Sequence, residues 1–193
     1  MPNPDASVSD RLLDACIQCM VEHGYVATTT RRVAEMAGVS QGAQQHYFPT
    51  KSALVEAAME RLFLQIMADA ATVGLDASDE RERAEILIER ICCIHSQPIA
   101  PAIFELFTVA RTDPQLAECT ARMTGEGMKA IISLAREALP TYAAKPGFEQ
   151  FVQIAMATAR GTAMIAAIPG AEGAYPEWSA VRSQMLAALD ELA

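Results

Sequence analysis

Residues 29–54 read TTRRVAEMAGVSQGAQQHYFPTKSAL, and this stretch decides the fold of the N-terminal part of the chain. Thr28 or Thr29 can cap a short helix that has apolar residues on one face, and Gly38 suits the turn that ends it. Ser40 can cap a second, very short helix that stops before a Phe-Pro pair. Two short helices joined by a turn that carries a glycine are typical of a helix-turn-helix.

The polar side chains of this stretch are of the kinds that contact double-stranded DNA. Hydroxyls and arginines can meet phosphates, amides can pair with adenine, and an arginine can pair with guanine. Small residues in the second helix would let its backbone approach the major groove, and a lysine beyond it suits a flanking phosphate. We expect DNA contacts from Thr29, Thr30, Arg31, Gln41, Gly42, Ala43, Gln44, Gln45, His46, Tyr47 and Lys51.

The motif resembles the DNA-binding region of the TetR family of bacterial repressors. The resemblance extends from residue 9 to about residue 54. Its matches, at fixed spacing, are residues 24–25, 28–34, 37–40, 42–43 and 47–51. It implies a helix-turn-helix DNA-binding domain at residues 1–51 and a helical ligand-binding and dimerisation domain at residues 52–193. It also implies a ligand-responsive repressor that binds a palindromic operator as a dimer.

Two positions depart from the family pattern. Position 44 is usually apolar in the family and is Gln44 here, and position 45 is usually an aromatic residue and is Gln45 here. Either the recognition helix reads bases with an additional amide, or it packs differently on the helix before it. Both interpretations stay open at the level of the sequence.

Caps, breaks and apolar spacing predict an all-α chain of about nine helices. We expect them at about residues 9–24, 29–37, 40–47, 50–73, 78–96, 100–112, 113–139, 146–168 and 175–192, with a break over residues 74–78. Ser9 or Asp10 is expected to cap the first of them. No stretch has the strict alternation of a strand.

The last two predicted helices are expected to form a dimer interface. Residues 154–168 are small or apolar on nearly every face, so another helix could approach them closely. Residues 185–192 give the last helix an apolar stripe, and two copies of the pair could form a four-helix bundle. The symmetry of such a dimer predicts a palindromic operator.

The predicted helices over residues 78–192 are expected to enclose a site for an unknown small-molecule effector. Ten methionines and few aromatic residues suggest an adaptable, mostly apolar cavity. We expect its lining to include Cys92, His95, Phe104, Phe107, Arg111, Met123, Met128, Met156 and Arg160. The histidine and an arginine could orient an acidic or polar group of the effector.

The net charge of −9 is unfavourable for binding DNA, but most of the excess lies outside the motif. Between residues 28 and 51 the charged side chains are Arg31, Arg32 and Lys51 against Glu35 alone. We therefore expect a small basic face on an acidic body. The chain has no signal-peptide pattern, and Gln153 and Arg160 interrupt its most apolar stretch, so we expect a cytoplasmic protein with no membrane partner.

Five cysteines without regular spacing predict neither a disulfide framework nor a metal site. A redox-triggered DNA-binding regulator that uses Cys16-Cys19 or Cys92-Cys93 is an alternative. A helical enzyme built around His95 is a remote second alternative, since no catalytic signature accompanies it. We expect no catalytic residues and no cofactor.

Overall fold

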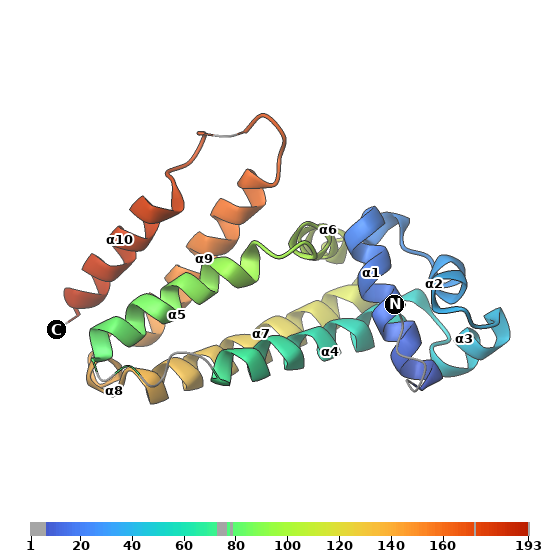
Figure 1. Cartoon of the computed structure of the whole chain (residues 1–193), viewed down its shortest axis with the longest axis horizontal. Helices are drawn as coiled ribbons and strands as arrows, with labels where there is room; N and C mark the ends of the chain where they lie inside the picture. Colours follow the sequence, from blue (N-terminus) through green and yellow to red (C-terminus); the bar gives the residue numbers. More distant parts are fainter. Residues whose placement is uncertain (1–6, 73–76, 78, 172, 193) are drawn as a thin grey trace. The chain divides into compact units, whose positions relative to one another are not determined.

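The computed structural model describes residues 7–72, 77, 79–171 and 173–192, and every regular element within them is a helix (Figure 1). The helices are α1 (Val8–Ala27), α2 (Thr30–Ala37), α3 (Gln41–Tyr47), α4 (Lys51–Thr72), α5 (Glu80–His95), α6 (Ala100–Ala110), α7 (Pro114–Ala138), α8 (Pro140–Ala143), α9 (Phe148–Ala166) and α10 (Trp178–Asp190). The all-α prediction is confirmed. The nine predicted helices correspond to all of these except α8.

Helix α8 is one additional turn, and the sequence reasoning did not predict it. Pro140 occupies its first turn, and the Glu80 carboxylate accepts the backbone N–H groups of Thr141 and Tyr142 at 2.8 and 3.3 Å. These bonds come from a residue 61 positions away, so local sequence could not indicate them. The predicted break at residues 74–78 lies, except for residue 77, outside the described residues.

Helix α1 begins and ends differently from the prediction. Its cap is Ser7, whose hydroxyl accepts the Asp10 N–H at 3.1 Å, so the prediction of a cap at Ser9 or Asp10 is wrong. Gly24 does not end the helix. It has φ 76° and ψ 170°, a conformation that favours glycine, and the helix resumes for one more turn to Ala27.

The chain divides into two compact units. The first spans Met1–Gln65 and Pro101–Thr124, and the second spans Ile66–Ala100 and Gly125–Ala193. The first unit therefore contains the predicted helix-turn-helix together with most of α6 and the N-terminal part of α7. A functional boundary after residue 51 stays a prediction.

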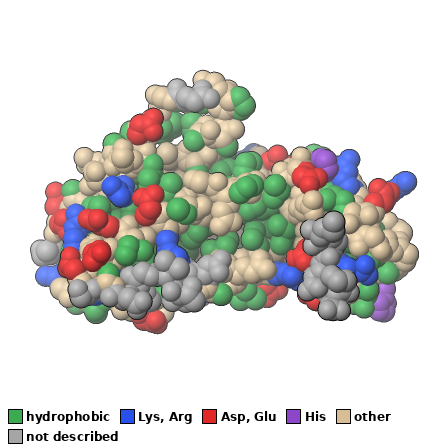
Figure 2. Space-filling model, viewed as in Figure 1, with side chains coloured by type: hydrophobic (Ala, Val, Ile, Leu, Met, Phe, Trp, Pro, Cys, Tyr) green, Lys and Arg blue, Asp and Glu red, His purple; other side chains and the backbone are tan. Residues whose placement is uncertain are grey.

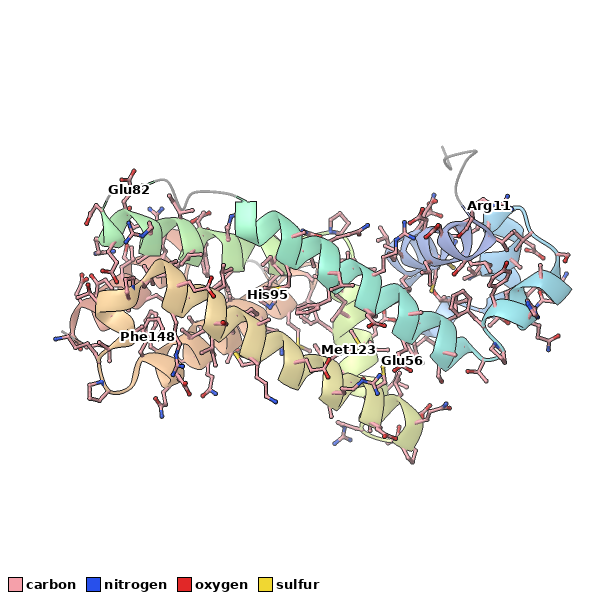
Figure 3. The ribbon with its side chains drawn as sticks, turned by 90° about the horizontal axis from the view of Figure 1, so that it is seen from below. Arg11, Glu56, Glu82, His95, Met123 and Phe148 are labelled. Carbon is pink, nitrogen blue, oxygen red and sulfur yellow. The ribbon has the colours of Figure 1, made fainter. Side chains whose placement is uncertain are left out.

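The first unit is held by an apolar core and by ion pairs between its helices. Its fully buried side chains include Leu12, Cys16, Cys19, Met20, Val33, Leu54 and Leu116. The Arg61 guanidinium of α4 bonds to Asp10 at 2.6 Å and Asp14 at 2.9 Å, both on α1. Glu56 of α4 pairs with Arg122 of α7, next to Met123 (Figure 3). These pairs fix α4 against α1 and α7.

The second unit is built from α5, the C-terminal part of α7, and α8 to α10. Its core contains Ile88, Leu139, Phe148, Val152, Val181, Met185, Leu186 and Leu189. Phe148, in the first turn of α9, is among the largest fully buried side chains (Figure 3). The Arg83 Nε donates to the Ala138 carbonyl at 2.7 Å and so links α5 to the end of α7.

Candidate nucleic-acid interface

Helices α2 and α3 form the predicted helix-turn-helix. The Thr29 hydroxyl caps α2 by accepting the Arg32 N–H at 3.2 Å, and the Ser40 hydroxyl caps α3 by accepting the Ala43 N–H at 3.1 Å. Gly38 ends α2 with φ 64° and ψ 38°, the left-handed conformation that a helix C-terminus favours. The local caps and the turn glycine thus fix the angle at which α3 leaves α2.

One face of this motif is buried and the other is exposed. Val33, Ala34 and Ala37 of α2 are buried. On α3 the polar side chains stand outward, and the exposed residues there are Gln41, Gly42, Gln45, His46 and Tyr47. Ala43 is partly buried, and at the start of α2 Thr29 is exposed and Thr30 is partly buried. The exposed face of α3 is therefore free to enter the major groove of DNA.

Gln44 is the exception, and of the two interpretations left open for it the structure has the one in which it packs inward. Its side chain is fully buried, its Nε2 donates to the Phe48 carbonyl at 2.6 Å, and its Oε1 accepts from Gln41 Nε2 at 2.9 Å. A buried amide is stable only when its polar atoms are bonded, and here both are. Gln44 therefore ends α3 and orients Gln41, while the adjacent Gln45 projects outward. The two departures from the family pattern have different physical roles.

Both arginines of α2 are engaged within the chain. The Arg31 Nε bonds to the Glu35 carboxylate at 3.0 Å, one turn along the exposed side of α2. The Arg32 Nη1 donates to the Ala27 carbonyl at 2.6 Å. A phosphate that approaches Arg31 must therefore compete with Glu35.

Lys51 lies at the start of α4 and turns toward the end of α1. Its ammonium donates to the carbonyls of Tyr25 at 2.7 Å and Val26 at 3.4 Å, and it lies 4.0 Å from the centre of the Tyr25 ring. Burial lowers the pKa of the ammonium, and nearby Cys16, Cys19 and Glu105 oppose that shift. An ammonium has three N–H donors, and these two carbonyls account for two of them.

The face drawn in Figure 2 shows the surface around this motif, at the right of the view. Blue, red and purple side chains alternate there, so basic, acidic and histidine groups are interspersed rather than gathered in one basic patch. Electrostatic attraction to DNA would accordingly be local and modest.

The residues predicted to line an effector site are divided between the two units. Phe104, Phe107, Arg111 and Met123 belong to the first, and Cys92, His95, Met128, Met156 and Arg160 belong to the second. Arg111 is exposed, and its place in the lining of an effector site stays a prediction. Helix α6 ends at Ala110, one residue before it, instead of at the predicted residue 112.

The remaining predicted lining residues are buried or half-buried. His95, Phe104 and Met156 are buried, and Cys92, Phe107, Met123, Met128 and Arg160 are half-buried. His95 ends α5, is 8% exposed, and bonds through Nδ1 to the Ile91 carbonyl at 2.8 Å (Figure 3). Burial lowers the pKa of its imidazole, the Ile91 carbonyl opposes this, and the Arg160 guanidinium adds to it. His95 and Arg160 thus place a buried imidazole, disfavoured as a cation, near a guanidinium in the second unit.

An apolar groove runs between α9 and α10, and the sequence did not reveal it as a groove. Its volume is about 510 Å³, and its lining includes Phe151, Ile154, Ala155, Val181, Met185 and Ala188. None of the side chains that line it is charged. Ile154 is 64% exposed there. A large exposed aliphatic side chain beside an uncharged groove is typical of a surface that binds another protein.

The five cysteines differ in their exposure: Cys16, Cys19 and Cys119 are buried, Cys92 is half-buried and Cys93 is exposed. Cys16 and Cys19 are fully buried, and burial raises the pKa of the Cys16 thiol to about 12. A thiol that stays protonated is a poor nucleophile. Among the described residues, no three histidine, cysteine or carboxylate side chains are grouped as a metal site would require. None of the helices in the described residues is both long and apolar enough to cross a membrane.

Comparison with known proteins places the helix-turn-helix in a family. Residues 12–58 match the family described as "Bacterial regulatory proteins, tetR family". The nucleoid occlusion factor SlmA of Glaesserella parasuis is 33% identical over 92 residues, which are 46% of this chain and 43% of that protein. The transcriptional repressor AcnR of Corynebacterium diphtheriae is 28% identical over 103 residues, 53% of this chain and 50% of AcnR. The chain thus spans no more than half the length of these relatives.

Solved structures share the fold along nearly the whole chain. A TetR transcription regulator from Haloarcula marismortui superposes with a TM-score of 0.72 at 15% identity and covers 96% of each chain. The transcriptional regulator FadR of Bacillus subtilis, solved in complex with stearoyl-CoA, superposes with a TM-score of 0.70 at 15% identity, over 93% of this chain and 96% of FadR. At such identities the likeness concerns the fold alone. Residues 12–58 thus match the tetR family of bacterial regulatory proteins, and the chain as a whole shares the fold of these solved regulators.

Proposed function

We propose that the protein is a DNA-binding transcription regulator, most simply a repressor, that binds a palindromic operator as a homodimer. The observation that carries this proposal is the exposed polar face of α3, fixed by the Ser40 cap and by the buried amide of Gln44. Gln41, Gln45 and His46 present amide and imidazole groups that can bond to base edges in a major groove. No step of this function is catalytic.

The DNA contacts divide by type. Thr29, Arg31 and Lys51 are placed for phosphates, which hold the protein in register without reading sequence. Gln41, Gln45 and His46 are placed for bases, and Gly42 allows α3 to approach them closely. Gln44 has no direct contact in this proposal, because its two polar atoms are bonded inside the motif.

Dimerisation through α9 and α10 is supported by the groove between them. An uncharged groove with an exposed isoleucine buries best against an equally apolar surface, and a second copy of the same pair supplies one. The four-helix bundle that results would give each dimer two recognition helices related by a two-fold axis. Operator half-sites about one helical turn apart, or a multiple of it, follow from that symmetry.

An effector is proposed to bind in the second unit near His95 and Arg160. These two groups can bond to a polar or acidic end of a small molecule, and the buried Met156 lies one helical turn before Arg160 on α9. FadR, which has the same fold, holds stearoyl-CoA. An effector shifts the protein off DNA only if it binds the DNA-free conformation more tightly.

The proposal is tested by a fluorescence anisotropy titration of labelled DNA from the region upstream of the protein's own gene. We expect tight binding to one segment, weak binding to a scrambled segment of equal length, and an affinity that falls steeply with salt. Equal affinity for both segments at low salt would contradict the proposal.

A redox trigger is the second candidate. It would have to use Cys92 and Cys93, which are half-buried and exposed, because burial disfavours the pair at Cys16 and Cys19. Cys16 and Cys19 are both fully buried, and Cys16 has a raised pKa. A repressor that responds only to a ligand should keep its affinity for the upstream segment after peroxide treatment. A loss of affinity that a thiol reductant restores would favour the redox trigger instead.

A further inference from the structure

Four consecutive residues near the end of α1 bond to side chains from three other helices and a turn. We call residues 24–27 the α1 elbow. The Gly24 carbonyl accepts the Thr28 hydroxyl at 2.8 Å, the Tyr25 carbonyl accepts Lys51 Nζ at 2.7 Å, the Val26 N–H donates to Glu105 Oε2 at 3.3 Å, and the Ala27 carbonyl accepts Arg32 Nη1 at 2.6 Å. Two of these partners, Lys51 and Arg32, belong to the helix-turn-helix surface.

Glu105 is the partner that comes from farthest along the chain. It lies on α6, which belongs to the same compact unit, and it reaches a residue 79 positions away. Its carboxylate occupies the space where a side chain at position 24 would stand. A Cβ built on Gly24 would lie 2.8 Å from both carboxylate oxygens, so the Glu105 side chain would have to shift away. The absence of a side chain at Gly24 therefore admits Glu105 to the elbow.

The peptide group between Tyr25 and Val26 is bonded on one side to a carboxylate and on the other to an ammonium. The carboxylate of Glu105 faces the Val26 N–H, while the ammonium of Lys51 faces the carbonyls of Tyr25 and Val26. Glu105 and Lys51 also attract each other, since the Glu105 charge favours the protonated lysine. Hydrogen bonds to charged groups are stronger than neutral ones, so this pair fixes the orientation of the elbow.

We infer that Glu105 is a positioning residue for the DNA-binding surface. From α6 it fixes the α1 elbow, and the elbow in turn places the Lys51 ammonium and the Arg32 guanidinium. A change in the position of α6 would therefore change the affinity for DNA. This inference rests on the proposed function, because DNA binding is its main readout.

The test compares Glu105→Ala, Glu105→Gln and the control Glu118→Gln, which removes one exposed carboxylate from α7 of the same unit. Operator affinity is measured by anisotropy on the full-length chain, alone and combined with Lys51→Met. Glu105→Ala should weaken operator binding about tenfold, the scale of one lost hydrogen bond to a charged group. Glu105→Gln should have a smaller effect, because its amide oxygen still accepts a hydrogen bond, and the control should match wild type.

The double variant separates positioning from general stability. If Glu105 acts through Lys51, then Glu105→Ala should weaken DNA binding much less in the Lys51→Met background than in wild type. The inference would be overturned if the loss of operator affinity in the double variant equalled the product of the losses in the two single variants. It would also be overturned if Glu105→Ala bound the operator as wild type does. Either result would leave the proposed function intact.

Amide hydrogen exchange in the DNA-free protein gives a readout that does not depend on DNA. Glu105→Ala should speed exchange at Val26 at least about tenfold, while exchange in the core of α1 stays slow. Unchanged exchange at Val26 would also overturn the inference. Wild-type protein that exchanges as expected but binds no operator would instead refute the proposed function, and with it the role of Glu105 in DNA binding.

Discussion

The helix-turn-helix and the second unit are both built from helices, yet their sequences reveal their functions to very different degrees. In the motif, Thr29, Gly38 and Ser40 each make one local bond or turn that only a few residue types can make. In the second unit, Ile88, Val152 and Leu189 fill space that other aliphatic side chains could fill as well. Local backbone chemistry is therefore readable from sequence, whereas packing is not.

The largest effect is expected from a substitution in the second unit, at the proposed dimer surface. Ile154→Glu adds a charge to the groove between α9 and α10, and burying an unpaired charge costs several kcal/mol. We expect a monomer by light scattering and a loss of operator affinity of roughly 100-fold or more, because a monomer contacts only one half-site.

Gln153→Glu is the matched control, since Gln153 is the exposed neighbour that does not line the groove. It should remain dimeric and bind the operator as wild type does. A dimeric Ile154→Glu variant would remove α9 and α10 from the interface.

The next effect sharpens the difference between two adjacent glutamines of the motif. Gln44→Ala leaves the Phe48 carbonyl without its buried donor, so the free energy of unfolding should fall by about 1–3 kcal/mol. Gln45→Ala changes an exposed side chain and should alter stability by less than about 0.5 kcal/mol.

For base preference the larger effect should come from Gln45→Ala and the smaller from Gln44→Ala. Gln45→Ala should relax the preference at one operator position by about 1–3 kcal/mol if its amide reads a base. Chemical denaturation and a set of single-base operator variants measure the two quantities. Equal loss of stability in both variants would show that their environments do not differ.

A third prediction concerns the pH dependence of the second unit. Because burial lowers the pKa of His95 in the folded chain, the unfolded chain takes up the proton first as pH falls. The free energy of unfolding should therefore decrease as the pH drops through about 6.5, the ordinary value of the imidazole, and level off below the folded-state pKa.

His95→Gln should lose this part of the pH dependence, whereas His46→Gln, on the exposed face of α3, should keep it. Urea denaturation at several pH values between about 5 and 8 measures the difference. The same pH dependence in wild type and His95→Gln would contradict the assignment.

The smallest expected effect lies on the exposed side of α2. Glu35→Gln removes the carboxylate that competes with DNA for Arg31. An exposed pair of this spacing is worth about 0.2–0.5 kcal/mol, so affinity for any DNA should rise about twofold. The salt dependence should steepen slightly, as measured by anisotropy over a salt series. An unchanged affinity would mean that Glu35 does not restrain Arg31.

The sequence predicted the fold well and the site only in part. The helices, the caps at Thr29 and Ser40 and the turn at Gly38 were predictable, because each depends on residues within four positions of one another. The burial of Gln44 was not predictable, since a glutamine at that position can project outward or bond inward at equal local cost. The contacts of Lys51 with Tyr25 and of Glu105 with Val26 depend on tertiary packing, which no local pattern encodes.

The central claim is that two copies of α3 read a symmetric operator, and hydroxyl-radical footprinting on DNA upstream of the protein's own gene tests it most directly. At about 50 mM salt, where electrostatic binding is strong, we expect two protected blocks related by two-fold symmetry. Their centres should lie about 10 base pairs apart or a multiple of that spacing. A single unsymmetric block, or uniform protection along the DNA, would contradict the claim.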